Sequence, residues 1–292
     1  MHLTRFLKLR KAVEGLDSHF IRTKLHDLDR SLKGQGLPLS PADTAITQEG
    51  IFYVEPITGI ATKVVAYRAT LTTPSNPKRN LKNPNKPYVA PQEIEKLGPY
   101  HLMRCNILTD AEKEGWPLEY TLSRRLSGSF PFRIVGQPRG KSKPEIYQSI
   151  DEQQLYVCSN CLWKASSILG PGKAPKRDAF NIQDFFDVNK ARSWNSLGAL
   201  AKDFGFMKNM YPEDWFEISK IRKRQINFHC EYCYRDLSAP HLQRYLHVHP
   251  TDHVENAEGY VRLECLCVAC LADLPGYSDL KHHADFGAFR DA

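Results

Sequence analysis

Cys230-Glu231-Tyr232-Cys233 and Cys267-Val268-Ala269-Cys270 decide the fold of the C-terminal part of this chain. Each stretch is a CxxC pair, and 33 residues separate the two pairs. Together they supply the four thiolates that a tetrahedral structural zinc site needs. In a chain without a secretion signal, such pairs bind zinc rather than form disulfides. The spacing therefore predicts a structural zinc ion held by these four cysteines.

A third CxxC pair, Cys158 and Cys161, supplies only two ligands and needs two more. Upstream, three residues separate His101 from Cys105, which is about one helical turn, so both side chains can face one metal. We predict a second structural zinc site from these four residues, which would tie the first β-rich region to the middle of the chain. In the alternative, Cys105 is a buried apolar thiol and His101 a surface residue.

The bulk composition is that of a globular protein, with 292 residues of which 41% are hydrophobic and 25% charged. We expect no membrane span, because the chain contains no run of about 18 apolar residues. The basic N-terminus is not followed by an apolar core and a cleavage site, so we expect no secretion signal and a cytoplasmic protein. The net charge of +7 favours a polyanionic partner such as nucleic acid.

Hydrophobic spacing predicts the main elements. Apolar residues recur at helical spacing over 4–33, and the segment 180–224 is also helical in pattern. A β-hairpin is expected where β-branched runs over 51–54 and 61–70 flank the turn Pro56-Ile57-Thr58-Gly59. A second hairpin is expected to join 118–122 to 130–135. The N-terminal half is therefore predicted to be rich in strands, and the middle to be helical.

The residues between the two C-terminal CxxC pairs carry a family resemblance. Leu246-His247-Val248-His249 matches L-x-V-H, and Leu263, Leu266, Cys267 and Cys270 match a following L-x-x-L-C-x-x-C. This order resembles HNH endonucleases of the zinc-stapled kind, over about residues 228–282. The resemblance implies a ββα module in a bacterial protein of phage defence or mobile-element biology.

The signature residues of that family are mostly replaced. In the HNH mechanism a histidine acts as general base, neighbouring His or acidic groups hold a divalent ion, and an asparagine orients the base. His249 keeps the first metal-type position. Pro250 stands at the base position, Arg262 at the asparagine position and Leu271 at the final histidine position. The resemblance therefore implies a catalytically degenerate module.

The fold class that we predict is α+β, with a β-rich N-terminal half, a helical middle and a C-terminal zinc-stabilised ββα (HNH-like) module. The predicted segments are a helical N-terminal segment over 1–48, a β-rich domain with a zinc site over 49–178, a helical connector over 179–226 and the HNH-like zinc module over 227–292.

The function that we favour is a degenerate module, a pseudoenzyme, that serves as a subunit binding nucleic acid (DNA favoured) or a protein partner in a larger complex. Arg262 would add positive charge to the former active-site groove and grip phosphate without cutting it. The predicted nucleic-acid-binding residues are Arg222, Lys223, Arg224, Arg244 and Arg262. A treble-clef-like zinc module without nuclease ancestry is a further alternative.

An active metal-dependent DNA endonuclease with a relocated metal site is the competing function. His247 and His249 share one face of a strand because side chains two apart point the same way. His241 lies just before them, and Asp252 and His253 lie just beyond. Such a cluster can rebuild a site for Mg²⁺ or Mn²⁺, with His249 and His247 as the catalytic residues.

Overall fold

The computed structural model describes residues 19–73, 97–115, 120–136, 145–169, 176–187, 213–251 and 260–290. The strands are β1 (Leu37–Pro38), β2 (Thr44–Ile46), β3 (Ile51–Val54), β4 (Ile60–Arg68), β5 (Thr70–Thr73), β6 (Tyr120–Ser123), β7 (Ser129–Gly136), β8 (Glu145–Gln154), β9 (Leu246–Thr251) and β10 (Tyr260–Cys267). The helices are α3 (Asn106–Lys113), α4 (Ser159–Leu169), α6 (Glu213–Gln225), α7 (Val268–Ala272) and α8 (Ala284–Arg290), with 3-10 turns η1 (Arg177–Ala179), η2 (Gln243–Tyr245) and η3 (Ser278–His282). Two further helices span 19–33 and 182–187.

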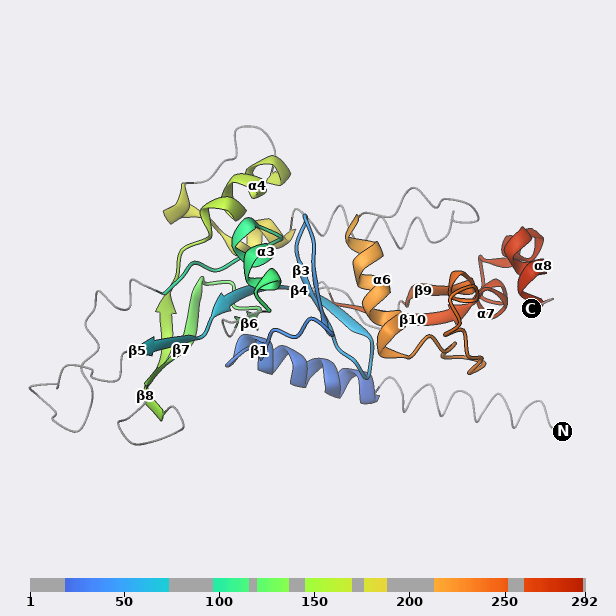
Figure 1. The fold of residues 1–292 in the computed structure, drawn as a ribbon, viewed down its shortest axis with the longest axis horizontal. Helices are drawn as coiled ribbons and strands as arrows, with labels where there is room; N and C mark the ends of the chain where they lie inside the picture. Colours follow the sequence, from blue (N-terminus) through green and yellow to red (C-terminus); the bar gives the residue numbers. More distant parts are fainter. Residues whose placement is uncertain are drawn as a thin grey trace, which may run out of the picture.

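Strand β4 is the centre of the larger, seven-stranded sheet. It pairs antiparallel with β3, β6 and β10, and β10 in turn pairs with β9. The nine residues of β4 are nearly all buried, as expected of a central strand covered on both faces. The strands that follow the first C-terminal cysteine pair are therefore continuous with the sheet of the N-terminal half, as Figure 1 shows.

The α+β class and the first hairpin are confirmed. β3 and β4 form the hairpin predicted over 51–54 and 61–70, with Phe52 opposite Lys63 in the register. The second predicted hairpin is wrong, because β6 pairs with β1 and β4 whereas β7 lies in a separate sheet of order β5-β7-β8. Buried positions on β6 match the large sheet, and this tertiary preference overrides the short loop that separates β6 from β7.

Two hydrophobic cores flank the shared strands β3 and β4. The first core contains Ile51 and Ile60 together with the helix over 19–33 and helices α3 and α4. The second core contains Phe52 and Ala61 together with α6, β9, β10 and α7. Neighbouring residues of one strand thus enter different cores, because successive strand side chains point to opposite faces. The division into four segments, with boundaries at 48, 178 and 226, stays a prediction.

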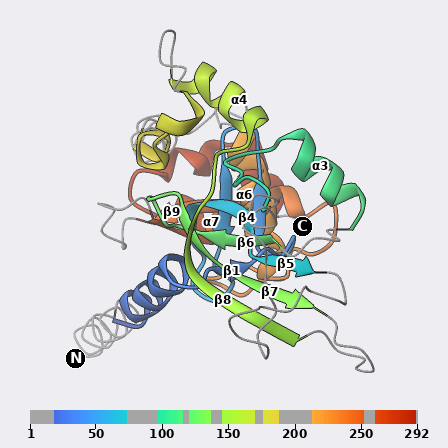
Figure 2. The same ribbon diagram turned by 90° about the vertical axis from the view of Figure 1, so that its left-hand side faces the viewer.

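The helix over 19–33 covers the first core and lies beneath the sheet in Figure 1. Its buried residues Ile21, Leu28 and Leu32 follow helical spacing. Residues 1–18 of the predicted N-terminal helical segment lie outside the described residues. Figure 2 shows the same helix at the lower left, with α4 at the top of the molecule.

Helix α6 leads directly into the first C-terminal CxxC pair. Its basic last turn ends where Asn227 and Phe228 take left-handed backbone angles, with φ of 51° and 58°. The N–H of Phe228 donates to the carbonyl of Lys223 at 2.9 Å, which closes the helix C-terminus. In the described part of the chain, no helix is both long and apolar enough to cross a bilayer.

Candidate metal centres

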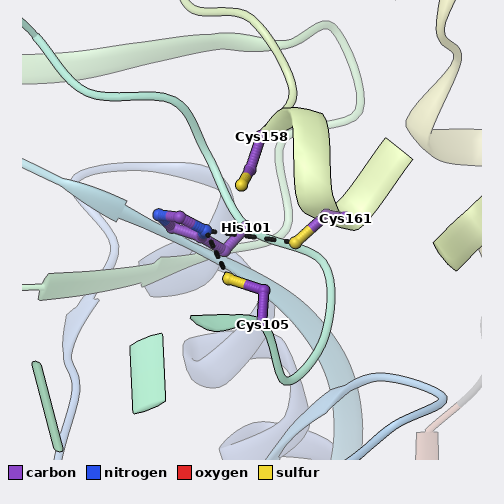
Figure 3. A group of neighbouring side chains, drawn as sticks. All are labelled: His101, Cys105, Cys158 and Cys161. Atoms are coloured by element: carbon purple, nitrogen blue, oxygen red, sulfur yellow. Dashed lines mark hydrogen bonds between the residues drawn. The ribbon is translucent and has the colours of Figure 1, made fainter. Parts of the chain in front are cut away.

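The first metal centre brings together His101, Cys105, Cys158 and Cys161. The ligand atoms of all four side chains lie within 4.8 Å of one another, and each residue is at most 1% exposed. The Nδ1 of His101 lies 3.3 Å from the sulfur of Cys105 and 4.0 Å from that of Cys161. Figure 3 shows the three thiols arranged around the imidazole. The structure therefore brings together the four residues predicted as one site, which span residues 101 to 161 of the chain.

Three separate pieces of backbone position these ligands. His101 forms an antiparallel bridge with Ala66 of β4, through hydrogen bonds of 2.7 and 3.0 Å. Cys105 is the N-cap residue of α3, and Cys158 and Cys161 lie at the start of α4. The helical turn expected between His101 and Cys105 is wrong, because Leu102 and Met103 form a bend and Cys105 is extended (φ −137°, ψ 166°). The two side chains converge because the chain turns between the bridge and α3.

The chemistry of the first centre fits a zinc ion. Hydrogen bonding to Cys105 lowers the pKa of the Cys158 thiol and raises that of the Cys161 thiol. The pKa of His101 is lowered by burial, but hydrogen bonds to Cys105 and Cys158 outweigh this and raise it to about 9. Crowded thiols cannot all ionise without a cation between them, because like charges repel. Zn²⁺ would hold the three as thiolates and the imidazole as a neutral ligand.

The second metal centre joins Cys230, Cys233, Cys267 and Cys270, whose sulfur atoms also lie within 4.8 Å of one another. Cys230 and Cys267 are buried, Cys233 is exposed and Cys270 is half-buried. The sulfur atoms of Cys233 and Cys267 are 3.8 Å apart. An all-sulfur tetrahedral set is typical of structural zinc. This centre therefore lies at the rim of the molecule, whereas the first lies inside its core.

Backbone N–H groups stabilise the charge on these sulfur atoms. The N–H of Cys267 donates to the sulfur of Cys230 at 3.3 Å, and the N–H of Cys270 donates to the sulfur of Cys267 at 3.4 Å. Hydrogen bonds, first of all from Cys267, lower the pKa of Cys230 to about 4. Cys267 is also the N-cap residue of α7, where the helix dipole favours a thiolate.

A partly buried ion pair fixes the knuckle around Cys230 to the sheet. The guanidinium of Arg222 on α6 lies 2.5 Å from a carboxylate oxygen of Glu231 and also donates to the carbonyls of Leu263 and Pro56. The other oxygen of Glu231 accepts the N–H of Cys265 at 2.6 Å. Arg222 is 2% exposed, so its donors serve the fold. The sequence analysis did not identify Glu231 as a structural residue. An acidic residue between the two cysteines of a CxxC pair is a signal that could have indicated an ion pair with a nearby basic side chain.

The turn of the β3–β4 hairpin meets Arg222 at close range. Gly59 has φ of 69°, and a Cβ there would collide with the guanidinium and with the carbonyl of Leu263. The N–H of Leu263 donates to the Gly59 carbonyl at 3.0 Å. Glycine is therefore required both by backbone angle and by space.

The positions that the HNH resemblance would make catalytic lie on β9, β10 and α7. The Nδ1 of His249 is 3.1 Å from the hydroxyl of Tyr277, whose ring packs edge-on against the imidazole. Glu264 is opposite His249 in the register. Leu271 is buried in the second core. No local signal in the sequence points to Tyr277, which reaches His249 through the fold of the segment after α7.

The second predicted catalytic residue, His247, is partly buried, and its Nε2 has no hydrogen-bond partner among the described residues. Burial, with a smaller contribution from Lys223, lowers its pKa to about 4. Within the described ranges, the two groups of His, Cys, Asp or Glu side chains that are close enough to hold a metal are the two tetrads above. Asp252 and His253 lie outside the described residues.

The predicted nucleic-acid-binding residues differ in exposure. Arg224 is exposed, and Arg244 is exposed with its guanidinium 4.5 Å from the Tyr245 ring. Lys223 is half-buried, and burial lowers its pKa. Arg262 lies 3.3 Å from the Glu264 carboxylate with its side chain 16% exposed. The predicted role of Arg222 is wrong, because its side chain is buried and its donors are engaged inside the fold.

Comparison with known proteins gives one curated relative. Over 180 residues the chain is 26% identical to the Zorya protein ZorE of Escherichia coli (strain ATCC 8739). The match covers 60% of this chain and 44% of that protein, so the chain spans less than half the length of its relative. No protein-family model matches the chain. No solved structure matches it.

Proposed function

We propose that this chain is a zinc-binding protein of a bacterial defence system, in which an HNH-like module binds nucleic acid without cleaving it. The two tetrads support the zinc. The similarity to the Zorya protein ZorE supports the setting, which the HNH resemblance also implies. We further propose that the chain acts as one subunit of a multi-protein defence complex.

The single observation that carries the loss of cleavage is the environment of His249. This one retained signature residue hydrogen-bonds the Tyr277 hydroxyl at 3.1 Å. Its neighbour Pro250 cannot accept a proton, and the final ligand position is a leucine packed in the second core. Hydrolysis by one metal needs a base and further ligands beside that histidine. The retained geometry therefore serves packing of the segment after α7 onto β9.

Positive charge near the same hairpin supports binding to nucleic acid. Arg224 and Arg244 are exposed on the C-terminal half, whereas Arg262 is mostly buried beside the Glu264 carboxylate. Exposed arginines neutralise phosphates and release condensed counterions, which makes affinity fall with salt. With a net charge of +7, the chain favours a polyanion as its partner.

A cleavage assay tests the catalytic half of the proposal. Purified protein and its His249→Ala variant are incubated with plasmid and single-stranded DNA in Mg²⁺ and in Mn²⁺. We expect no cleavage by either protein. Metal-dependent cleavage that disappears in His249→Ala would show an active endonuclease, with its metal site completed by residues such as Asp252 or His253.

A binding assay tests the nucleic-acid half. We expect Arg224→Ala and Arg244→Ala each to weaken duplex DNA binding and to reduce the salt slope by about 1. Lys113→Ala on α3, where the side chain is 71% exposed, is the matched control and should leave binding unchanged. A wild-type protein that binds neither duplex nor single strands would point instead to a protein partner.

A further inference from the structure

The zinc knuckle of the second centre carries two exposed aromatic side chains that the fold does not use. Tyr232 and Tyr234 flank Cys233 and are 71% and 78% exposed. In the part of the chain described from residue 226 onward, they are the large hydrophobic side chains that remain exposed. Exposed aromatic rings at a rigid metal-held turn need a reason, because packing gains nothing from them.

The backbone angle of Tyr234 also indicates that this side chain is not there for stability. Its φ is 59°, in the left-handed region that glycine occupies without strain and a bulky residue seldom occupies. Two hydrogen bonds hold the turn: the Tyr234 N–H donates to the Cys230 carbonyl at 2.9 Å, and the Cys230 N–H donates to the Arg235 carbonyl at 3.0 Å. A tyrosine that costs backbone strain and buries little surface contributes little to stability.

Cations lie next to the two tyrosines. Arg235 follows Tyr234 directly, is exposed, and places its guanidinium 4.4 Å from the ring of Phe289 on α8. Phe289 in turn packs on Tyr245, whose other neighbour is the guanidinium of Arg244. Two arginines thus flank one aromatic pair beside the knuckle, and stacking restricts the orientation of both.

The nearby acidic groups are already engaged. Asp236 accepts the N–H of Ser238 at 2.8 Å, and Asp285 lies 3.7 Å from the Arg244 guanidinium. Glu231 is paired with Arg222 inside the knuckle. Asp236 stays exposed and ionised on the knuckle. The exposed phenol rings and the Arg235 guanidinium match the π faces of bases and the charge of phosphates.

We propose that Tyr232 and Tyr234 form a stacking platform for unpaired bases, and that Arg235 contacts the adjacent phosphates, so that the knuckle binds single-stranded nucleic acid. The inference deepens the proposed function and rests on it, since it specifies which surface binds and which form of nucleic acid it takes. Exposed rings cannot stack on bases inside a duplex, so the platform discriminates single strands from duplexes.

The test compares four proteins with matched zinc content by fluorescence anisotropy. They are the wild type, Tyr232→Ala, Tyr234→Gly and Trp163→Ala, and the probes are a labelled oligothymidine of about 12 nucleotides and a duplex of equal length. Trp163 is 77% exposed on α4, in the part of the fold that packs on the first core, and serves as the matched aromatic control. Tyr234→Gly relieves the strained backbone, so its melting temperature should equal or exceed that of the wild type.

We expect each tyrosine variant to bind the single strand about tenfold more weakly, with duplex binding changed less than twofold and Trp163→Ala unchanged in both. Single-strand binding that survives in both tyrosine variants would overturn the platform and leave the proposed function standing. A wild type that binds neither probe would overturn the nucleic-acid function and the platform together. Equal losses for single strand and duplex would also overturn the platform, because they indicate a general phosphate contact.

Discussion

The two candidate metal centres have similar ligands but differ in burial and in the elements that they connect. The first, around His101, is enclosed in the first core and collects ligands from a β bridge, the start of α3 and the start of α4. The second, around Cys267, lies at the rim, with Cys233 exposed. Because the first centre is buried, removing its metal would leave the imidazole and the thiols inside a core without water to solvate them. The second is a local staple between a knuckle and a hairpin.

A bound metal would contribute differently to the stability of the two regions. Around the first centre, strands and helices already share an extensive core, and the metal would fix the relative positions of elements that are distant in sequence. Around the second, the ion pair between Arg222 and Glu231 and the pairing of β10 with β4 share the task. We therefore expect the second region to tolerate perturbation better than the first.

The largest effect is expected from Cys161→Ala. The remaining three ligands would be left buried without a metal, at a cost of more than about 5 kcal/mol, because zinc binding energy is folding energy. We expect loss of the cooperative unfolding transition by calorimetry and of one zinc equivalent by metal analysis. A variant that keeps both zinc equivalents and its melting temperature would show that the first tetrad does not hold a structural zinc.

A smaller effect is expected from Cys267→Ala, compared with Cys265→Ala two residues away on β10. Both side chains are buried, but Cys265 is outside the tetrad. Cys267→Ala should lose one zinc equivalent and expose amides of 229–290 to hydrogen exchange, whereas the first core stays protected. Cys265→Ala should keep its zinc and cost about 1 kcal/mol. Equal behaviour of the two variants would argue against a metal at the second centre.

Arg222→Met asks how much of the second region depends on the ion pair. Removing one partner leaves Glu231 facing a buried neighbourhood, and we expect about 3 kcal/mol of destabilisation in urea unfolding. Arg222→Met combined with Glu231→Gln should recover part of this loss, since no charge is then left unpaired. A double variant less stable than the sum of the singles would contradict this account.

The smallest effect is a pH dependence at His247. Burial lowers its pKa to about 4 from an ordinary value of 6.5, so the unfolded chain binds the proton first as the pH falls. Stability from this group is complete above about pH 6.5 and is lost as the pH falls toward 4. Between about pH 7.5 and 5.5 the wild type should lose about 1 kcal/mol that His247→Phe does not lose, in urea unfolding with saturating zinc. Parallel losses in both proteins would assign the pH dependence to other groups.

Much of both metal centres could be predicted from the sequence, because CxxC pairs bring two sulfur atoms together through local backbone alone. His101 and Cys105 lie together for a different reason from the one expected, since a bend replaces the helical turn. The second hairpin was wrong because the choice of sheet for β6 depends on burial against β4. Burial of Arg222 could not be predicted, as its partners come from residues 56, 231 and 263.

The sequence by itself determined the donor atoms: eight residues with soft sulfur or imidazole groups at spacings that two tetrahedral sites accept. It also determined that Pro250, where the HNH resemblance places the base, cannot accept a proton, since residue type alone decides that chemistry. Only the tertiary structure decided that β10 joins β4, that Tyr277 contacts His249 and that two tyrosines of the knuckle stay exposed. The physical reason is that ligand spacing is a local property of the sequence. Strand partners and burial depend instead on which distant surfaces pack together.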